Sequence, residues 1–464
     1  MAAVVPRYEE WLRPELVGEV GAAAGDPPQV AELRSDAFEA FRILALEPNP
    51  LYRKYGYFAG VDLRGLDPLA AGPAVAIPPA STERIQIVHD ASGTRVQLPT
   101  ALRTAGVRIE TLHEAWTDGP AGTLPFLRGA EQPPDRLSAL GLALLNRGYR
   151  LTIPDHCSAT AQVHDITVLS RPHEALSVRR SISVGEESRL LMTEELFSTP
   201  EVFPEQRLSA SSVDIDLKAR SEAAFLSLHA PDPRAIGLYQ RHATVGAQAK
   251  HSWIWNGFGG FRTKVRNQTV LEGEGSATDD LQSFFGAEQQ AYDSSVNIVH
   301  VGTNTHGQSI TRGVFRDEAR GMSRGLVRIE PGARGTLSYI SEHAMLLSPG
   351  TRSDTIPVLE ILCPDVKATH STSVAPVDPE KVFYLESRGM RRADAIRMIG
   401  EGFLSHVLDR APIAHLREIL YPALANRWEN QVLWWDPNDL PSLPDLAFAG
   451  TETTTDWRFD FKLR

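Results

Sequence analysis

The residues most able to do chemistry lie in one stretch, residues 357–389, of this 464-residue chain. His370 ends a run that alternates as a strand does, which puts it on the same face as Val366 and Ala368. A neutral imidazole there could ligate a metal through one nitrogen while a hydrogen bond orients the other. The competing interpretation is a hydrogen-bonded histidine in a β-rich core.

Cys157 and Cys363 are the only cysteines. Two are too few for a disulfide framework, or for a zinc site or cluster ligated wholly by thiolates of one chain. Cys363 could offer a soft thiolate ligand, although a free cysteine is commonly a small buried hydrophobic residue. Any metal bound here therefore needs histidine, carboxylate or the ligands of a second chain.

Around these residues the hydrophobic period changes from that of a strand to that of a helix. Residues 358–363 alternate, and residues 366–371 form a second short strand. Asp378 then starts a helix, because its side chain can accept from free N–H groups and the proline after it fits the first turn. Gly389 ends that helix. The stretch thus joins a β architecture to a helical one.

Short β-rich runs, separated by Gly, Asp, Asn or Pro turns, recur from about residue 154 to about residue 373. Long helical crossovers, which parallel strands in a simple sheet need, are scarce. Two folds stay open on this pattern: an antiparallel sandwich or barrel, and a solenoid whose strands stack on counterparts about 20 residues away. Tight hairpin signals are also scarce, which favours the solenoid.

Helical patterns flank this β-rich part. Two helices are predicted up to about residue 46, the second beginning after Ser35 and Asp36. The chain then divides into four parts. These are an N-terminal helical and mixed region (1–134), a β core (135–377), a C-terminal helical domain (378–430) and an aromatic tail (431–464).

The net charge of −11 argues against a nucleic-acid binder, because phosphate contacts need clustered Lys and Arg. Basic pairs such as Arg179-Arg180 and Arg391-Arg392 are interpreted as solvated faces. No apolar run approaches the ~20 residues that span a bilayer, and the N-terminus does not have the pattern of a signal peptide. We therefore expect a cytoplasmic protein that binds neither nucleic acid nor membranes.

Several runs resemble, in order, the SufB/SufD family, which assembles iron–sulfur clusters. They are GYRLTIP (148–154), LEGEGS (271–276), RGLVRIEPGA (324–333), and the series LEI (359–361), DVKATHS (365–371) and VFYLESRG (382–389). The resemblance covers roughly residues 135–408. It implies a mainly β fold, a right-handed parallel β-helix (solenoid) core flanked by an N-terminal helical region and C-terminal helices.

The resemblance implies a non-enzymatic scaffold subunit of the SUF machinery. In the family two β-helix subunits, SufB and SufD, pair side by side, and each docks the ATPase SufC through its C-terminal helices. An iron–sulfur cluster is built transiently at or near the subunit interface. This chain would then bind no nucleotide, and its partners would be a SufC-type ATPase and either a SufB-type subunit or a second copy of itself.

The helical segment after Asp378 is the part that would dock the ATPase. The residues implied are Phe383, Tyr384, Arg388, Ile396, Ile399, Phe403 and Val407. The apolar helix face among them could equally pack on the chain's own β-helix.

Two departures from the SufB pattern make the chain SufD-like. SufB-type chains follow the matched histidine with a glutamate used at the cluster site, whereas Ser371 follows His370 here. SufB also uses a cysteine one coil earlier, where the nearest positions here are Glu342 and His343. The candidate cluster ligands are therefore His370, Glu342, His343 and Cys363.

Two other functions stay open. A diverged family member could serve a specialised metal-dependent or biosynthetic pathway, because the tail is unmatched and the SufB-type ligands are missing. A carbohydrate-active β-helix enzyme would need carboxylates clustered along one groove and usually secretion, and the sequence offers neither an obvious Asp/Glu ladder nor a signal peptide.

Overall fold

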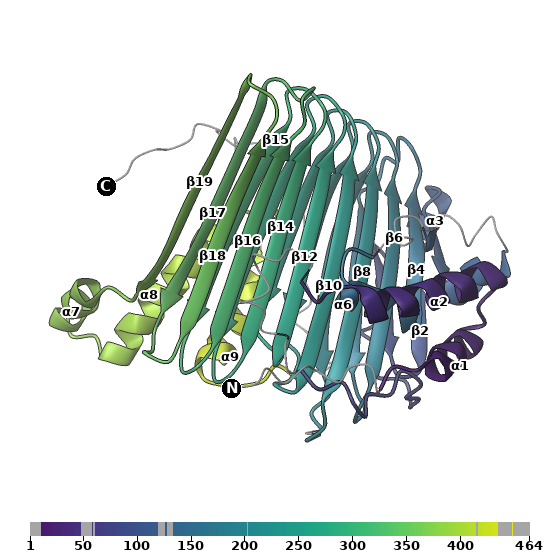
Figure 1. Cartoon of the computed structure of the whole chain (residues 1–464), viewed down its shortest axis with the longest axis horizontal. Coiled ribbons are helices and arrows are strands. Elements are labelled where there is room, and N and C mark those ends of the chain that lie inside the picture. Colours follow the sequence, from purple (N-terminus) through teal and green to yellow (C-terminus); the bar gives the residue numbers. More distant parts are fainter. Residues whose placement is uncertain are drawn as a thin grey trace.

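The computed structural model describes residues 11–47, 58, 61–118, 126–127, 133–201, 203–413, 416–434 and 448. Its centre is a solenoid whose strands form two long sheets, with helices from both ends of the chain packed on its outside (Figure 1). Neighbouring strands of successive coils run parallel. The predicted mainly β, parallel solenoid is therefore confirmed, and the antiparallel sandwich is excluded.

Each coil contributes one strand to each sheet. The ten-stranded sheet contains, in spatial order, β19 (Val366–Pro376), β17 (Thr336–Leu346), β15 (His306–Phe315), β13 (Ala277–Gly286), β11 (Lys250–Gly257), β9 (Glu222–His229), β7 (Arg189–Ser198), β5 (Ala161–Leu169), β1 (Arg84–Asp90) and β2 (Gly93–Gln97). The nine-stranded sheet contains β18 (Arg352–Ile361), β16 (Arg320–Ile329), β14 (Ala291–His300), β12 (Arg262–Leu271), β10 (Ala235–Val245), β8 (Arg207–Leu217), β6 (Ala175–Val184), β4 (Arg147–Ile153) and β3 (Arg108–Thr111). Because β1, β2 and β3 extend both sheets, the β architecture continues into the region before residue 135.

The coil is longer than the sequence pattern predicted. Leu281 pairs with Ile310, and Ile298 pairs with Val327, in each case 29 positions further along the chain. The predicted spacing of about 20 residues is wrong, because most strands in these coils have ten or eleven residues and every coil adds two corners.

One line of corners is held by residues in the left-handed backbone conformation. His156, Glu187, Arg220, Gln248 and Asn304 have φ of 56° or 57°. Each donates its backbone N–H to a carbonyl oxygen of the next coil. The conformation costs about 1 kcal/mol for a residue with a side chain, and the hydrogen bond between coils offsets that cost. Successive coils are therefore held in register by their backbones.

Helices from the C-terminal part cover the outer face of the ten-stranded sheet. They are α8 (Arg392–Leu408) and α9 (Leu416–Trp428) (Figure 1). Leu404, Val407 and Leu424 of these helices pack in one cluster with Leu281 and Val314 of the sheet. Burial of this apolar surface fixes the helices to the solenoid.

Helices from the N-terminal part cover the nine-stranded sheet. α6 (Arg136–Ala143) lies on the sheet, and α2 (Pro28–Ile43) and α1 (Pro14–Ala24) pack in the same cluster. The predicted start of the second helix after Ser35 and Asp36 is wrong, because Pro28 already occupies its first turn and both residues lie exposed within α2.

Three further short helices are α3 (Thr100–Thr104), α4 (Leu112–Thr117) and α7 (Pro379–Ser387). The predicted limits of α7 are confirmed. The side chain of Asp378 accepts a hydrogen bond from the N–H of Glu380, and Gly389 follows the helix with φ of 89°.

Candidate functional site

The last coil leaves an open edge on both sheets. Among the described residues β18 pairs only with β16, and β19 only with β17 (Figure 1). The free N–H and C=O groups of such an edge can pair with a strand of another chain. Most of β19 is exposed, whereas β17 before it is buried or half-buried. This end of the solenoid therefore offers an open edge to which a strand of another chain could be added.

Large apolar side chains are exposed in the same part of the chain. Outside it, the described residues expose Ile43, Leu69 and Val301. Those within residues 361–398 are Ile361, Leu362, Val374, Phe383, Tyr384 and Met398. Phe383 is 71% exposed and Leu362 is 51% exposed. The exposed large apolar residues of the described chain are thus concentrated in this part of the sequence, along and beyond the last coil.

His370 lies on this open strand and is exposed. It pairs with Ile340, which belongs to the apolar interior of the solenoid, so the two side chains lie on the inner face. Val366 and Ala368 pack against the same interior cluster, which confirms the predicted face of His370. Its imidazole has no hydrogen-bond partner among the described residues.

Glu342 is on the inner face of β17, two residues after Ile340, which pairs with His370. Its carboxylate accepts a hydrogen bond of 2.6 Å from the Ser323 hydroxyl, and its Oε2 has no partner among the described residues. Burial raises the pKa of Glu342 to about 7. The carboxyl group therefore gains or loses its proton near neutral pH.

His343 follows Glu342 and consequently lies on the outer face of the same strand. Its Nδ1 contacts the Ser373 hydroxyl of β19, and α8 lies nearby with His406. Burial, with the charge of Arg312, lowers the pKa of His343 to about 4, so it is neutral at pH 7. Strand alternation separates His343 from Glu342 and His370.

Cys363 lies just after β18 and is a free, buried thiol. It packs in the interior cluster with Ile340, and Ala368 lies against the same cluster. In the described part of the chain, no three His, Cys, Asp or Glu side chains are grouped so that they could hold a metal ion. The sequence-derived candidates are brought to one end of the solenoid, but they do not form a complete ligand set there.

The first part of the predicted docking segment is accessible. α7 extends from the end of the solenoid near β19 (Figure 1). Phe383 and Tyr384 are exposed, and the Arg388 guanidinium lies 5.2 Å from the centre of the Tyr384 ring. Ile396 and Ile399 at the start of α8 are half-buried.

The second part of that segment packs on the chain itself. Val407 is fully buried against the ten-stranded sheet, and Phe403 is half-buried with Arg312 stacked 5.2 Å from its ring centre. The predicted place on a docking surface is therefore wrong for Val407, because the apolar face of α8 covers the chain's own sheet from Phe403 onward.

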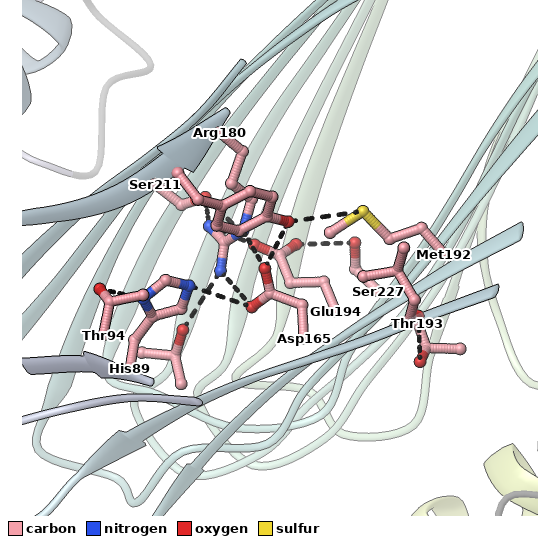
Figure 2. Close-up of polar contacts among 12 residues, drawn as sticks. His89, Thr94, Asp165, Arg180, Met192, Thr193, Glu194, Ser211 and Ser227 are labelled. Carbon is pink, nitrogen blue, oxygen red and sulfur yellow. Dashed lines mark hydrogen bonds and ion pairs between the residues drawn. The ribbon is translucent and has the colours of Figure 1, made fainter. Parts of the chain in front are cut away.

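A charged network fills the interior at the other end of the solenoid. Figure 2 shows the Arg180 guanidinium between the carboxylates of Asp165 and Glu194. It donates two hydrogen bonds of 2.7 Å to Asp165 and lies 3.2 Å from Glu194, and Tyr149 donates a further 2.7 Å bond to Asp165. Burial alone would raise the pKa of Asp165, but Arg180 and His89 hold it well below its usual range.

Glu194 extends the network to the next coils. It accepts hydrogen bonds from Ser227 at 2.9 Å and from Arg241 at 2.8 Å, and it lies 3.1 Å from His229 Nε2. Burial would raise its pKa, yet Arg180, His229 and Arg241 lower it well below the usual value. The charges are paired with one another, so the network fits a structural role.

The sequence pattern did not predict this network. It indicated a solvated face for Arg179-Arg180, whereas both side chains are buried, so that interpretation is wrong. The signal is the fit of Arg180 to Asp165 and Glu194, each about half a coil away along the chain, and it becomes visible only once the register is known. The pair Arg391-Arg392 is exposed, as predicted.

Comparison with known proteins gives a consistent match. Residues 167–403 match the family model described as "SUF system FeS cluster assembly, SufBD core domain". The iron–sulfur cluster assembly protein SufD of Bacillus subtilis is 27% identical over 303 residues, which cover 64% of this chain and 68% of that protein. The SufB protein of the same organism is 23% identical over 285 residues, 61% of each chain.

A SufBD family protein of Mycobacterium tuberculosis is 27% identical over 221 residues, 48% of this chain. The match spans about a quarter of that longer relative, 26% of its length.

No helix in the described ranges combines the length and apolar character needed to cross a bilayer.

Proposed function

This chain belongs to the SufBD family of iron–sulfur cluster assembly proteins, and we propose that it acts there as a SufD-like, non-enzymatic scaffold subunit. Its open solenoid end would receive a SufB-type subunit or a second copy of the chain. Its α7 and the start of α8 would dock a SufC-type ATPase. We propose that the protein acts in the cytoplasm.

The observation that carries the proposal is the open last coil. β18 and β19 offer two long edges to a partner, and Leu362 and Val374 nearby are exposed apolar groups. A partner that continued both sheets would satisfy the free backbone groups and bury these side chains. The chain alone does neither.

In this proposal the iron–sulfur cluster is cargo and not a resident group. The donor set supports a shared position, because His370 is accessible on the inner face at the open end while Cys363 is buried and Glu342 lies inside. His370 would supply one ligand, and its imidazole has no hydrogen-bond partner in the described part of the chain that would prevent this. The remaining ligands would come from the partner, with Glu342 nearby as a carboxylate that exchanges a proton near pH 7.

The docking proposal rests on α7. Phe383 and Tyr384 present aromatic area to solvent on a short helix that extends from the solenoid, and Arg388 stacks on Tyr384. Aromatic residues and arginine are enriched in the centres of protein interfaces. Ile396 and Ile399 would border this surface, and Phe403 would mark its limit.

Co-purification tests the assembly. The full chain is expressed with a SufB-type subunit and a SufC-type ATPase under reducing, anaerobic conditions, and the complex is analysed by size-exclusion chromatography. We expect one complex that contains all three chains, or this chain paired with itself and the ATPase. Failure to associate with either partner would contradict the scaffold role and favour the specialised-pathway alternative.

His370→Ala tests the ligand. We expect the reconstituted complex to form normally but to hold much less iron and sulfide, because one cluster ligand is lost. His113→Ala, which changes an exposed histidine on α4, is the matched control. An unchanged cluster yield in the His370 variant would reject the ligand role while leaving the assembly proposal intact.

A further inference from the structure

A cavity of about 270 Å³ lies on the nine-stranded sheet beside α6, far along the solenoid from the open end. Its floor is formed by outward-facing side chains of four neighbouring strands, β6, β8, β10 and β12. The Ser177 hydroxyl of β6 donates a hydrogen bond to the Gly141 carbonyl, which holds α6 close to the sheet. This volume suits a small molecule.

The floor contains a polar row in strict register. Arg179 pairs with Ser212, Ser212 with Gln240, and Gln240 with Arg266. Side chains at paired positions on one face lie next to each other, so the row crosses the cavity from one arginine to the other. Gln268 lies beside it on β12 and also lines the cavity.

The two arginines at the ends of this row differ in how they are used. Arg179 is paired with Asp214 at 2.7 Å and donates 2.9 Å to the carbonyl of Phe126. Among the described residues Arg266 has one ion-pair partner, Asp135 at 3.4 Å from its Nη1, and it donates no hydrogen bond there. Its Nε is buried and without a partner there. The Nε edge of a guanidinium is part of the fork that binds carboxylates.

Two amide side chains beside Arg266 offer further hydrogen-bond donors to the cavity. The side-chain amides of Gln240 and Gln268 have no hydrogen-bond partner in the described part of the chain. Leu137, Leu142 and Leu238 line the other side of the cavity. One side therefore offers Arg266 and two amides that are unpaired among the described residues, and the other offers apolar surface.

We propose that this cavity binds a small carboxylic acid with an apolar body. The carboxylate pairs with Arg266 and accepts from Gln240 or Gln268, and the body lies against the three leucines. The binding site does not depend on the proposed scaffold role, since it is built from side chains of a different part of the solenoid.

Calorimetric titration of the full chain with 2-naphthoate and with its neutral isostere 2-naphthamide tests the proposal. We expect saturable binding of 2-naphthoate and an affinity for 2-naphthamide that is lower by about tenfold or more, because the charge-assisted pair with Arg266 is lost. Equal affinities for the two probes, or no saturable binding of 2-naphthoate at millimolar concentration, would overturn the proposal.

Arg266→Gln should weaken 2-naphthoate binding by about tenfold or more and leave 2-naphthamide binding unchanged. Arg320→Gln, which changes an exposed arginine on β16, is the matched control and should change neither. If Arg266→Gln lowers the melting temperature, the double variant Gln240→Leu, Gln268→Leu replaces it and should likewise weaken 2-naphthoate binding. Tighter binding of 2-naphthyl phosphate than of 2-naphthoate would reassign the site to phosphate esters and overturn the carboxylate assignment.

Discussion

The two ends of the solenoid differ in how the parallel stack of strands is terminated. At the N-terminal end the parallel stack stops at β2 and β3, which are five and four residues long and pair antiparallel to β1 and β4. At the C-terminal end it stops at β18 and β19, which are ten and eleven residues long and continue the parallel stack. Short strands with reversed direction discourage further pairing, whereas long strands in register invite it.

The two ends also differ in how the polar groups of the interior are paired. Near the N-terminal end Asp165, Arg180 and Glu194 pair with one another inside the coil. Near the C-terminal end Glu342 keeps one oxygen without a partner among the described residues, and His370 is accessible. The charged groups at the N-terminal end thus pair with one another, whereas Glu342 and His370 at the C-terminal end lie where another molecule could pair with them.

The largest effect is expected at the completed end. Arg180→Met leaves two buried carboxylates without their cation, so the chain alone should lose about 3–5 kcal/mol of unfolding free energy in urea titrations followed by circular dichroism. The matched control is Arg220→Met, which removes an exposed corner arginine that also contacts two glutamates. It should leave the unfolding midpoint close to wild type. An equal loss of unfolding free energy in both variants would contradict the expected difference between buried and exposed ion pairs.

A smaller effect, on association with a partner and not on stability, is expected at the open end. Leu362→Asp should leave the stability of the isolated chain unchanged, because the side chain is exposed, but should weaken association with the partner about 30-fold or more. Val301→Asp introduces the same charge at an exposed apolar residue away from this end. Binding titrations in which both variants retain wild-type affinity would show that the open end is not the interface.

The smallest effect concerns pH and the interior between the ends. His251 is buried without hydrogen-bond partners among the described residues, and burial lowers its pKa to about 3 from 6.5. The unfolded chain takes up a proton below pH 6.5 and the folded chain does not, so stability is lost as the pH falls. Well below pH 6.5 and above pH 3, each further pH unit lowers the unfolding free energy by about 1.4 kcal/mol through His251.

His251→Phe should make that loss shallower by the same amount, measured as unfolding free energy in urea at pH 7, 6 and 5. The ring should still pack edge-on against Trp253, whose centre lies 4.4 Å away. His113→Phe on the exposed surface should leave the slope as it is. A slope unchanged by His251→Phe would mean that other groups set the acid sensitivity.

Local features were predictable from the sequence because nearby residues determine them. Asp378 and Gly389 fix the ends of α7 through contacts within a few residues, and the alternation around His370 fixes its face. The coil length was not predictable in this way, because the corners use varied residues such as Glu187, Arg220 and Gln248 and carry no constant motif.

The predictions that failed depend on contacts across coils or across the surface. Arg180 looks like half of a solvated basic pair until the register brings Asp165 and Glu194 to it. Val407 lies on an amphipathic helix face, and the pattern of such a face does not reveal whether a partner or the chain itself covers it. In both cases the outcome depends on contacts between residues that are far apart in the sequence.

The ladder of corner hydrogen bonds also makes the solenoid a ruler. Strands stack about 4.8 Å apart, so the stack from β4 to β18 holds its first and last strands about 34 Å apart. Backbone bonds set this length, and side chains only fill it. A chain with one coil fewer would therefore keep both ends and bring them about 5 Å closer together, without changing the residues that either end presents.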